Sequence, residues 1–130
     1  MHEQKGYWQL TVRDRFSAAH ALRHYQGKCE SLHGHNFGVE ICVQGKILTQ
    51  PVEILVDFSD LKRELKAVLH GLDHKNLNEL PEFQATNPSS ENLSCLIFRR
   101  LRPAMEKLMV RLVSVTVSEN ERQSATYFEN

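Results

Sequence analysis

The sequence lacks a long apolar run, an excess of charge of either sign and a full set of paired cysteines. No stretch approaches the roughly 20 apolar residues that a membrane-spanning helix needs, and the first five residues lack the apolar core of a signal peptide. Sixteen basic residues balance sixteen acidic ones, so the overall charge points neither to nucleic acid nor to an anionic membrane. We therefore expect a cytoplasmic protein that holds its ligands through local groups.

Cysteine is too scarce for a disulfide framework. Cys29, Cys42 and Cys95 cannot all pair, and none belongs to a CxxC motif. This pattern favours a reducing compartment. The chain also lacks repeats, linkers and low-complexity tracts, and its 130 residues suit one compact domain over residues 1–130.

What the sequence does contain is alternation of apolar and polar residues, which is typical of half-buried strands. We predict four strands, over residues 7–16, 33–47, 111–119 and 125–128. In the third of these, the alternation puts Val113, Val115 and Val117 on one face.

Apolar residues recur at helical spacing in two further segments, near residues 59–72 and 89–108. Ser59 is the expected N-cap of the first helix, and Pro103 should kink or split the second. Residues 73–88 should be mainly loop. This order predicts an α+β fold in which a four-stranded antiparallel sheet carries two helices on one face, inserted between strands two and three. The open edges of such a sheet favour oligomerisation by sheet extension.

Three histidines form a candidate metal site. His33 and His35 are two residues apart in a predicted strand, so they share a face and lie about 7 Å apart along it. With His20 as the third ligand, three neutral imidazoles would suit a catalytic zinc ion with an open position. The alternative is three polar residues that form local hydrogen bonds at strand ends.

The remaining candidates each allow two interpretations. Cys29 is either an incidental thiol or a fourth zinc ligand in a closed, structural site. The Asp73 carboxylate could fix the tautomer of His74, although neighbours in a loop need not touch. Glu119 continues the parity of a buried face, where its carboxylate needs a partner such as the N–C–N edge of a heterocycle; otherwise it is a solvated strand end.

Several motifs occur together in a set order: FSAAH over 16–20, Cys29, HGHNF over 33–37, VDFSDLK over 56–62, LDHKNLN over 72–78, NPSSEN over 87–92, and Glu119 in a late strand. In this combination the chain resembles the 6-pyruvoyl tetrahydropterin synthase superfamily. The gap of three residues between Cys29 and His33 is similar to its bacterial branch, the 6-carboxy-5,6,7,8-tetrahydropterin synthases. The chain departs from the family at Ser89, where threonine is usual, and over residues 120–123, which differ from the usual threonine-rich turn.

The resemblance implies a tunnelling fold that assembles into trimers or dimers of trimers, with sites at subunit interfaces. The substrate would be 7,8-dihydroneopterin triphosphate, and the products 6-carboxytetrahydropterin, acetaldehyde and triphosphate, in queuosine biosynthesis. Zinc would be held by His20, His33 and His35. Cys29 would be the general base, a role that suits a thiolate near a dication, with Asp73 and His74 as its partner dyad. Glu119 would anchor the pterin, and Arg23, His24 and Lys28 are candidates for the triphosphate.

Three other functions remain open at this point. The same fold could carry 6-pyruvoyl tetrahydropterin synthase activity, or it could act as a related pterin aldolase or epimerase. A zinc-stabilised binding module without turnover is the third possibility, and removing its metal should unfold it.

Overall fold

The computed structural model describes residues 5–27 and 30–130. Its centre is a five-stranded sheet with the order β3-β1-β2-β4-β5. All neighbouring strands are antiparallel except β3, which runs parallel to β1. The strands are β1 (Trp8–His20), β2 (His33–Gly45), β3 (Lys75–Asn76), β4 (Arg111–Asn120) and β5 (Gln123–Phe128).

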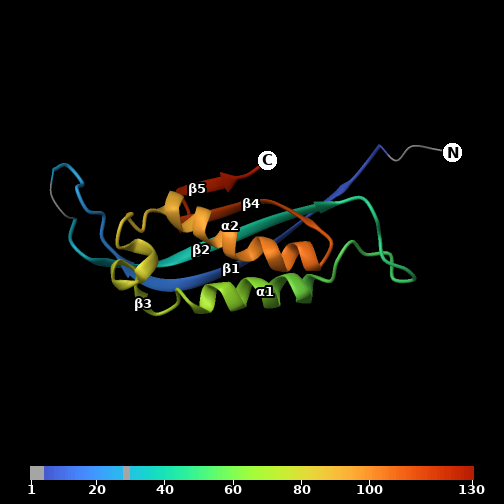
Figure 1. The fold of residues 1–130 in the computed structure, drawn as a ribbon, viewed down its shortest axis with the longest axis horizontal. Helices are drawn as coiled ribbons and strands as arrows, with labels where there is room; N and C mark the ends of the chain where they lie inside the picture. Colours follow the sequence, from blue (N-terminus) through green and yellow to red (C-terminus); the bar gives the residue numbers. More distant parts are fainter. Residues whose placement is uncertain (1–4, 28–29) are drawn as a thin grey trace.

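Two helices, α1 (Phe58–His70) and α2 (Ser90–Lys107), cover one face of this sheet (Figure 1). Helix α1 packs against β1, and α2 packs against β4 and β5. Two short 3-10 helices, η1 (Leu77–Glu79) and η2 (Pro81–Phe83), lie between α1 and α2 in the chain. Within the described residues, no helix is long and apolar enough to cross a membrane.

The core lies between the helices and the sheet. Its largest fully buried side chains are Phe16, Phe37, Phe83, Phe98, Ile41, Leu61, Leu65, Leu72, Leu77, Leu93, Ile97 and Leu101. The predicted α+β class and the order of two strands, two helices and two strands are confirmed. The sheet differs from the prediction in gaining the short parallel strand β3 inside the expected loop, at the edge beside β1.

Strand β1 is longer than its alternating residues predicted, because β2 pairs with it along its whole length. The register runs from Trp8 opposite Gly45 to His20 opposite His33 without a shift. The pairing therefore carries β1 past Phe16, its expected end, and places two histidines directly across from each other.

Each of the two long helices has a side chain that caps its N-terminus. Ser89 caps α2 and accepts a hydrogen bond from the backbone N–H of Asn92 at 3.1 Å. The N-cap of α1 is Asp57, however, and not Ser59. The Asp57 carboxylate accepts from the N–H and the hydroxyl of Ser59, and these bonds lower the pKa of Asp57. Pro103 lies inside α2 without splitting it.

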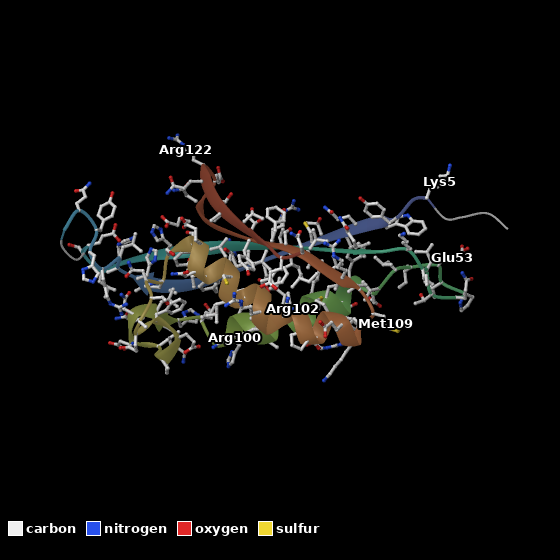
Figure 2. The ribbon with its side chains drawn as sticks, turned by 45° about the horizontal axis from the view of Figure 1, so that its top comes forward. Lys5, Glu53, Arg100, Arg102, Met109 and Arg122 are labelled. Carbon is white, nitrogen blue, oxygen red and sulfur yellow. The ribbon has the colours of Figure 1, made fainter. Side chains whose placement is uncertain are left out.

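Two register shifts disturb β4. The first pairs Val43 of β2 with Leu112 instead of Val113, so Leu112 takes the core position that the alternation had given to Val113. The second shift lies between β4 and β5 at Glu119, a residue that their register skips. Such bulges re-aim side chains, and this one sets the direction of Glu119. Beyond it, the β4–β5 hairpin rises from the rest of the molecule, with Arg122 at its tip (Figure 2).

Candidate metal centre

Three histidines converge where the β1–β2 pair ends. The ring centroids are 4.8 Å apart for His20 and His33, 4.8 Å for His33 and His35, and 5.3 Å for His20 and His35. One ligand atom from each of them lies within 4.8 Å of the others, a grouping that could hold a metal ion. The Phe37 ring packs edge-on against His20 and His35, at 5.1 and 5.4 Å, and so supports the cluster from the core side.

Two of these rings have their tautomer set by backbone carbonyls. The Nδ1 atom of His20 lies 2.7 Å from the Pro88 carbonyl oxygen, and Nδ1 of His33 lies 2.9 Å from that of Ser31. Because a carbonyl only accepts hydrogen bonds, each Nδ1 must carry the hydrogen. The Nε2 lone pair of each ring is then available, which is the arrangement that orients histidine ligands in metal sites.

The Nε2 atoms of His20 and His35 are buried and have no hydrogen-bond partner within the described part of the chain. Buried polar atoms are rarely left unpaired, because desolvation without a partner is costly. Nitrogen ligands suit Zn²⁺, so a metal ion fits the two atoms that the protein leaves unsatisfied. Burial also lowers the pKa of His35, with a smaller opposing effect from Glu119. The neutral imidazole so favoured is the form that binds metal.

The segment 87–92 explains why a carbonyl faces His20. The Asn87 side chain bonds both backbone groups of Arg23, accepting from its N–H at 2.8 Å and donating to its carbonyl at 2.9 Å. The Asn92 amide donates in turn to the Asn87 carbonyl at 2.8 Å. These bonds fix the turn that presents the Pro88 carbonyl to His20.

Arg23 stabilises a loop. Its guanidinium donates to the carbonyls of Phe83 at 2.6 Å, Asn78 at 3.1 Å and Thr86 at 3.2 Å. It therefore holds the segment around η1 and η2 against the end of β1. The guanidinium, a candidate for triphosphate binding in the sequence analysis, thus donates to three backbone carbonyls of this loop.

Glu119 lies beside the histidines. Its Oε2 atom is 3.6 Å from Nε2 of His35 and accepts a hydrogen bond from Nε2 of Gln123 at 3.4 Å, while its Oε1 accepts from the Ser90 hydroxyl at 3.3 Å. The carboxylate faces a cavity of about 200 Å³ lined by Ser90, Glu91, Glu119, Gln123, Ser124 and Ala125. Sequence reasoning missed Ser90 and Gln123, since neither has a spacing that marks it; Ser90 stood only inside the NPSSEN motif.

Asp73 and His74 form a pair at the edge of the sheet. The two carboxylate oxygens of Asp73 have different partners, since Oδ1 accepts from the N–H of Ser17 at 2.9 Å and Oδ2 lies 3.5 Å from Nε2 of His74. The backbone N–H of His74 donates to the Ser17 carbonyl at 2.6 Å. This bond holds His74 at a φ of 59°, in the left-handed region, with 82% of its side chain exposed.

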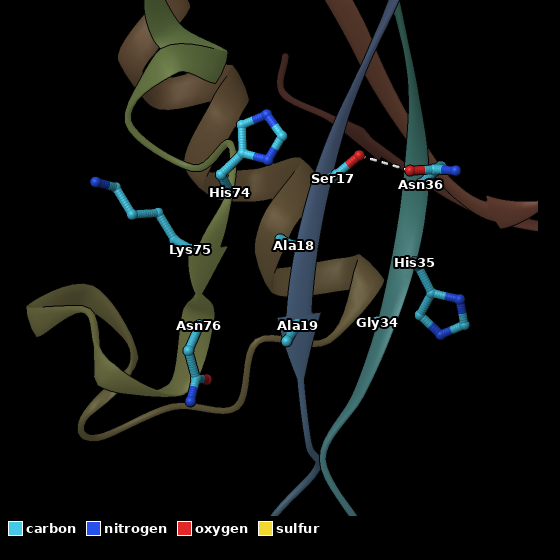
Figure 3. A pocket seen from close by; sticks show the side chains of 9 residues that line it. All are labelled: Ser17, Ala18, Ala19, Gly34, His35, Asn36, His74, Lys75 and Asn76. Carbon is cyan, nitrogen blue, oxygen red and sulfur yellow. Dashed lines mark hydrogen bonds between the residues drawn. The ribbon is translucent and has the colours of Figure 1, made fainter.

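The pair and the histidine cluster lie on opposite sides of β1 and β2. His74 and His35 both border a groove of about 570 Å³ beside β1. Ser17 and Asn36 line it as well, and their side chains are joined by a 2.5 Å hydrogen bond (Figure 3). Figure 3 shows His35 beyond β2, on the side away from His74. The structure therefore places Glu119 beside the three histidines, and Asp73 and His74 across β1 and β2 from them, although His35 and His74 both line the groove. Cys29 lies outside the described residues.

Comparison with known proteins gives one consistent result. Residues 9–130 match the family model of 6-pyruvoyl tetrahydropterin synthase. The chain is 41% identical over 112 residues to a putative 6-carboxy-5,6,7,8-tetrahydropterin synthase of Archaeoglobus fulgidus, covering 86% of this chain and 90% of that protein. It is 32% identical over 130 residues to the 6-pyruvoyl tetrahydrobiopterin synthase of Dictyostelium discoideum, covering 91% and 93%. The solved 6-pyruvoyl tetrahydropterin synthase of Caenorhabditis elegans superposes with a TM-score of 0.83 at 26% identity, covering 99% of this chain and 100% of that one.

Proposed function

The chain belongs to the 6-pyruvoyl tetrahydropterin synthase family, and from this premise we propose that it is a zinc-dependent 6-carboxy-5,6,7,8-tetrahydropterin synthase. The enzyme converts 7,8-dihydroneopterin triphosphate to 6-carboxytetrahydropterin, acetaldehyde and triphosphate, a step in queuosine biosynthesis. Likeness to the archaeal 6-carboxy relative supports this product, and the three-residue gap between Cys29 and His33 agrees with it.

The observation that carries the proposal is the convergence of His20, His33 and His35, with two ring tautomers set by carbonyls and two buried Nε2 atoms unpaired among the described residues. Three nitrogen ligands leave a position open for substrate. When bound, zinc supplies a Lewis acid that polarises oxygen atoms of the substrate side chain.

Glu119 anchors the pterin in this proposal. Its two oxygens match the ring N–H and the amino group at the N–C–N edge of the heterocycle, giving two parallel, charge-assisted hydrogen bonds. The Ser90 hydroxyl, which donates to the carboxylate at 3.3 Å, helps to hold it in place. Because Glu119 lies 3.6 Å from His35, a heterocycle bound to it would have its side chain close to the metal ligands.

Proton transfer is assigned to Cys29 and to the pair of Asp73 and His74. The Cys29 thiolate acts as general base at the substrate carbons that bear hydroxyls. Asp73 is fixed by the Ser17 N–H and faces His74 with its second oxygen, which orients the imidazole ring. In this proposal His74 is the group that holds and returns a proton.

The separation of the two residue sets favours a site that two copies of the chain share. Residues 8–16 of β1 form much of one sheet edge, beside Asp73 and His74, and β5 forms the other edge, beside Glu119. Pairing the β1 edge of one copy with the β5 edge of the next is a head-to-tail contact, and such contacts form a ring when the rotation between copies closes. This arrangement brings Asp73 and His74 of one copy toward the cluster of its neighbour, in a trimer or a dimer of trimers.

A second candidate is 6-pyruvoyl tetrahydropterin synthase activity on the same site, which the likeness to the Dictyostelium enzyme favours. The test is to incubate the zinc-loaded protein with 7,8-dihydroneopterin triphosphate and to identify the products by mass. Acetaldehyde with the 6-carboxy product supports the proposal. Elimination of triphosphate without loss of carbon would support the 6-pyruvoyl alternative, and aldehyde release with the phosphates retained would indicate an aldolase.

A further inference from the structure

Gln123 lies where the turn between β4 and β5 ends. The register shift at Glu119 pairs Asn120 with Gln123, so that Gln123 is the first residue of β5. Its amide nitrogen donates to Oε2 of Glu119 at 3.4 Å, and its side chain lines the same cavity of about 200 Å³. The side chain is thus a neighbour both of the carboxylate and of the space that the carboxylate faces.

The carboxylate determines which way the Gln123 amide points. An ionised carboxylate only accepts hydrogen bonds, so the NH₂ group of the amide must face Glu119, and the amide oxygen lies on the other branch. That oxygen is an acceptor with two lone pairs, held next to the cavity by the bond that its own nitrogen makes.

A pterin bound through its N–C–N edge has one donor left. The ring N–H and one hydrogen of the exocyclic amino group meet the two oxygens of Glu119, and the second amino hydrogen points away from them. A donor that gives up water on binding and finds no acceptor costs free energy. A site that accepts this hydrogen therefore discriminates against ligands that lack it.

We propose, on the basis of the pterin-binding role of Glu119, that Gln123 is a specificity-determining residue whose amide oxygen accepts the second hydrogen of the exocyclic amino group. The Gln123 nitrogen meanwhile holds Glu119 Oε2, opposite the Ser90 hydroxyl on Oε1. The substrate class that this arrangement selects is a 2-amino heterocycle with an unsubstituted amino group.

The test compares two ligands by calorimetric titration of the zinc-loaded, full-length protein: 7,8-dihydroneopterin and its analogue with one methyl group on the exocyclic amine. The analogue keeps the hydrogen for Glu119 and loses the one for Gln123. We expect the unmodified chain to bind the analogue about tenfold more weakly, equivalent to ~1.4 kcal/mol. Gln123→Ala should lower affinity for the parent ligand about tenfold and bind both ligands almost equally. Gln123→Met, which keeps the length of the side chain without its polar groups, should do the same.

Arg122→Ala is the matched control, because Arg122 lies in the same hairpin and projects from its tip (Figure 2). It should leave both affinities unchanged. If Gln123→Ala and Gln123→Met both keep the tenfold preference, the role of Gln123 is overturned. Glu119→Ala tests the pterin site itself, separately from the role of Gln123. If this variant binds the parent ligand as tightly as the unmodified chain does, the pterin site is wrongly placed.

Discussion

His20 and His33 lie directly opposite each other across the β1–β2 ladder, with ring centroids 4.8 Å apart. Each donates its Nδ1 hydrogen to a backbone carbonyl, that of Pro88 for His20 and that of Ser31 for His33. Strand pairing and two separate turns therefore leave both Nε2 lone pairs free for one metal ion. A metal ion bound here would be held by side chains already in position, without further folding around the ion.

His33→Ala should remove zinc and activity while leaving a folded protein, because the core between helices and sheet does not include His33. Elemental analysis gives the zinc content, and circular dichroism the fold. His70→Ala is the control, since His70 is an exposed histidine at the end of α1. Full zinc occupancy in His33→Ala would show that the ligand assignment is wrong.

Glu119→Gln should lose affinity for the pterin far more than for zinc. The amide turns one acceptor into a donor, which then faces a donor of the heterocycle. A buried mismatch of this kind costs about 1–3 kcal/mol, or roughly tenfold to a hundredfold in affinity. Titration with 7,8-dihydroneopterin measures the loss. Glu121→Gln, an exposed acid two residues along, should bind normally. Equal pterin affinities for the two variants would remove Glu119 from the site.

The stability of the metal-free protein should depend on pH through His35. Burial lowers the pKa of His35 in the folded state, so the unfolded chain, with a histidine pKa of about 6.5, binds more protons. The contribution of His35 to the free energy of unfolding is present above about pH 6.5. It is lost as the pH falls through the lowered pKa of the folded state. Urea unfolding in the presence of a chelator measures the free energy of unfolding from pH 5 to pH 8. This free energy should rise less with pH in His35→Asn than in the unmodified chain. Identical pH dependences would contradict this assignment.

The sequence was sufficient to predict most of the fold because its strands alternate and its helices have apolar stripes. It could not predict the end of β1, because residues 17–19 are small and carry no alternating signal; pairing with β2 extends the strand. The strand β3 depends on contacts between His74 and Ser17, residues far apart in the chain. No sequence pattern near either bulge in β4 predicts it, because each bulge arises from the pairing of neighbouring strands.

As with the fold, part of the candidate site could be predicted from the sequence and part could not. Two histidines at strand spacing and a third near a turn suggested the cluster that the structure brings together. The alternation of residues along the strand suggested that Glu119 lies on a buried face. The direction of its side chain toward His35 follows from the bulge. Asp73 and His74 lie across β1 and β2 from that cluster. Their position depends on the order of strands in the sheet, which cannot be derived from the spacing of residues along the chain.

Cys29→Ala should abolish turnover and retain zinc, since three histidines complete the ligand set of an open site. Loss of a general base typically costs about 10²–10⁴ in rate. Iodoacetamide should also modify Cys29 faster than Cys42, which is buried, or Cys95, which is half-buried, and bound substrate should protect it. Loss of zinc together with activity would instead identify Cys29 as a fourth ligand.

The most direct measurement for the account as a whole is product analysis of one protein sample, stripped of metal with a chelator and then reloaded with zinc. Incubated with 7,8-dihydroneopterin triphosphate, the reloaded protein should release 6-carboxytetrahydropterin, acetaldehyde and triphosphate in equal amounts by mass spectrometry. The stripped protein and His33→Ala should release none. Turnover that is the same in stripped and reloaded protein, or products that include no acetaldehyde, would contradict the proposed function.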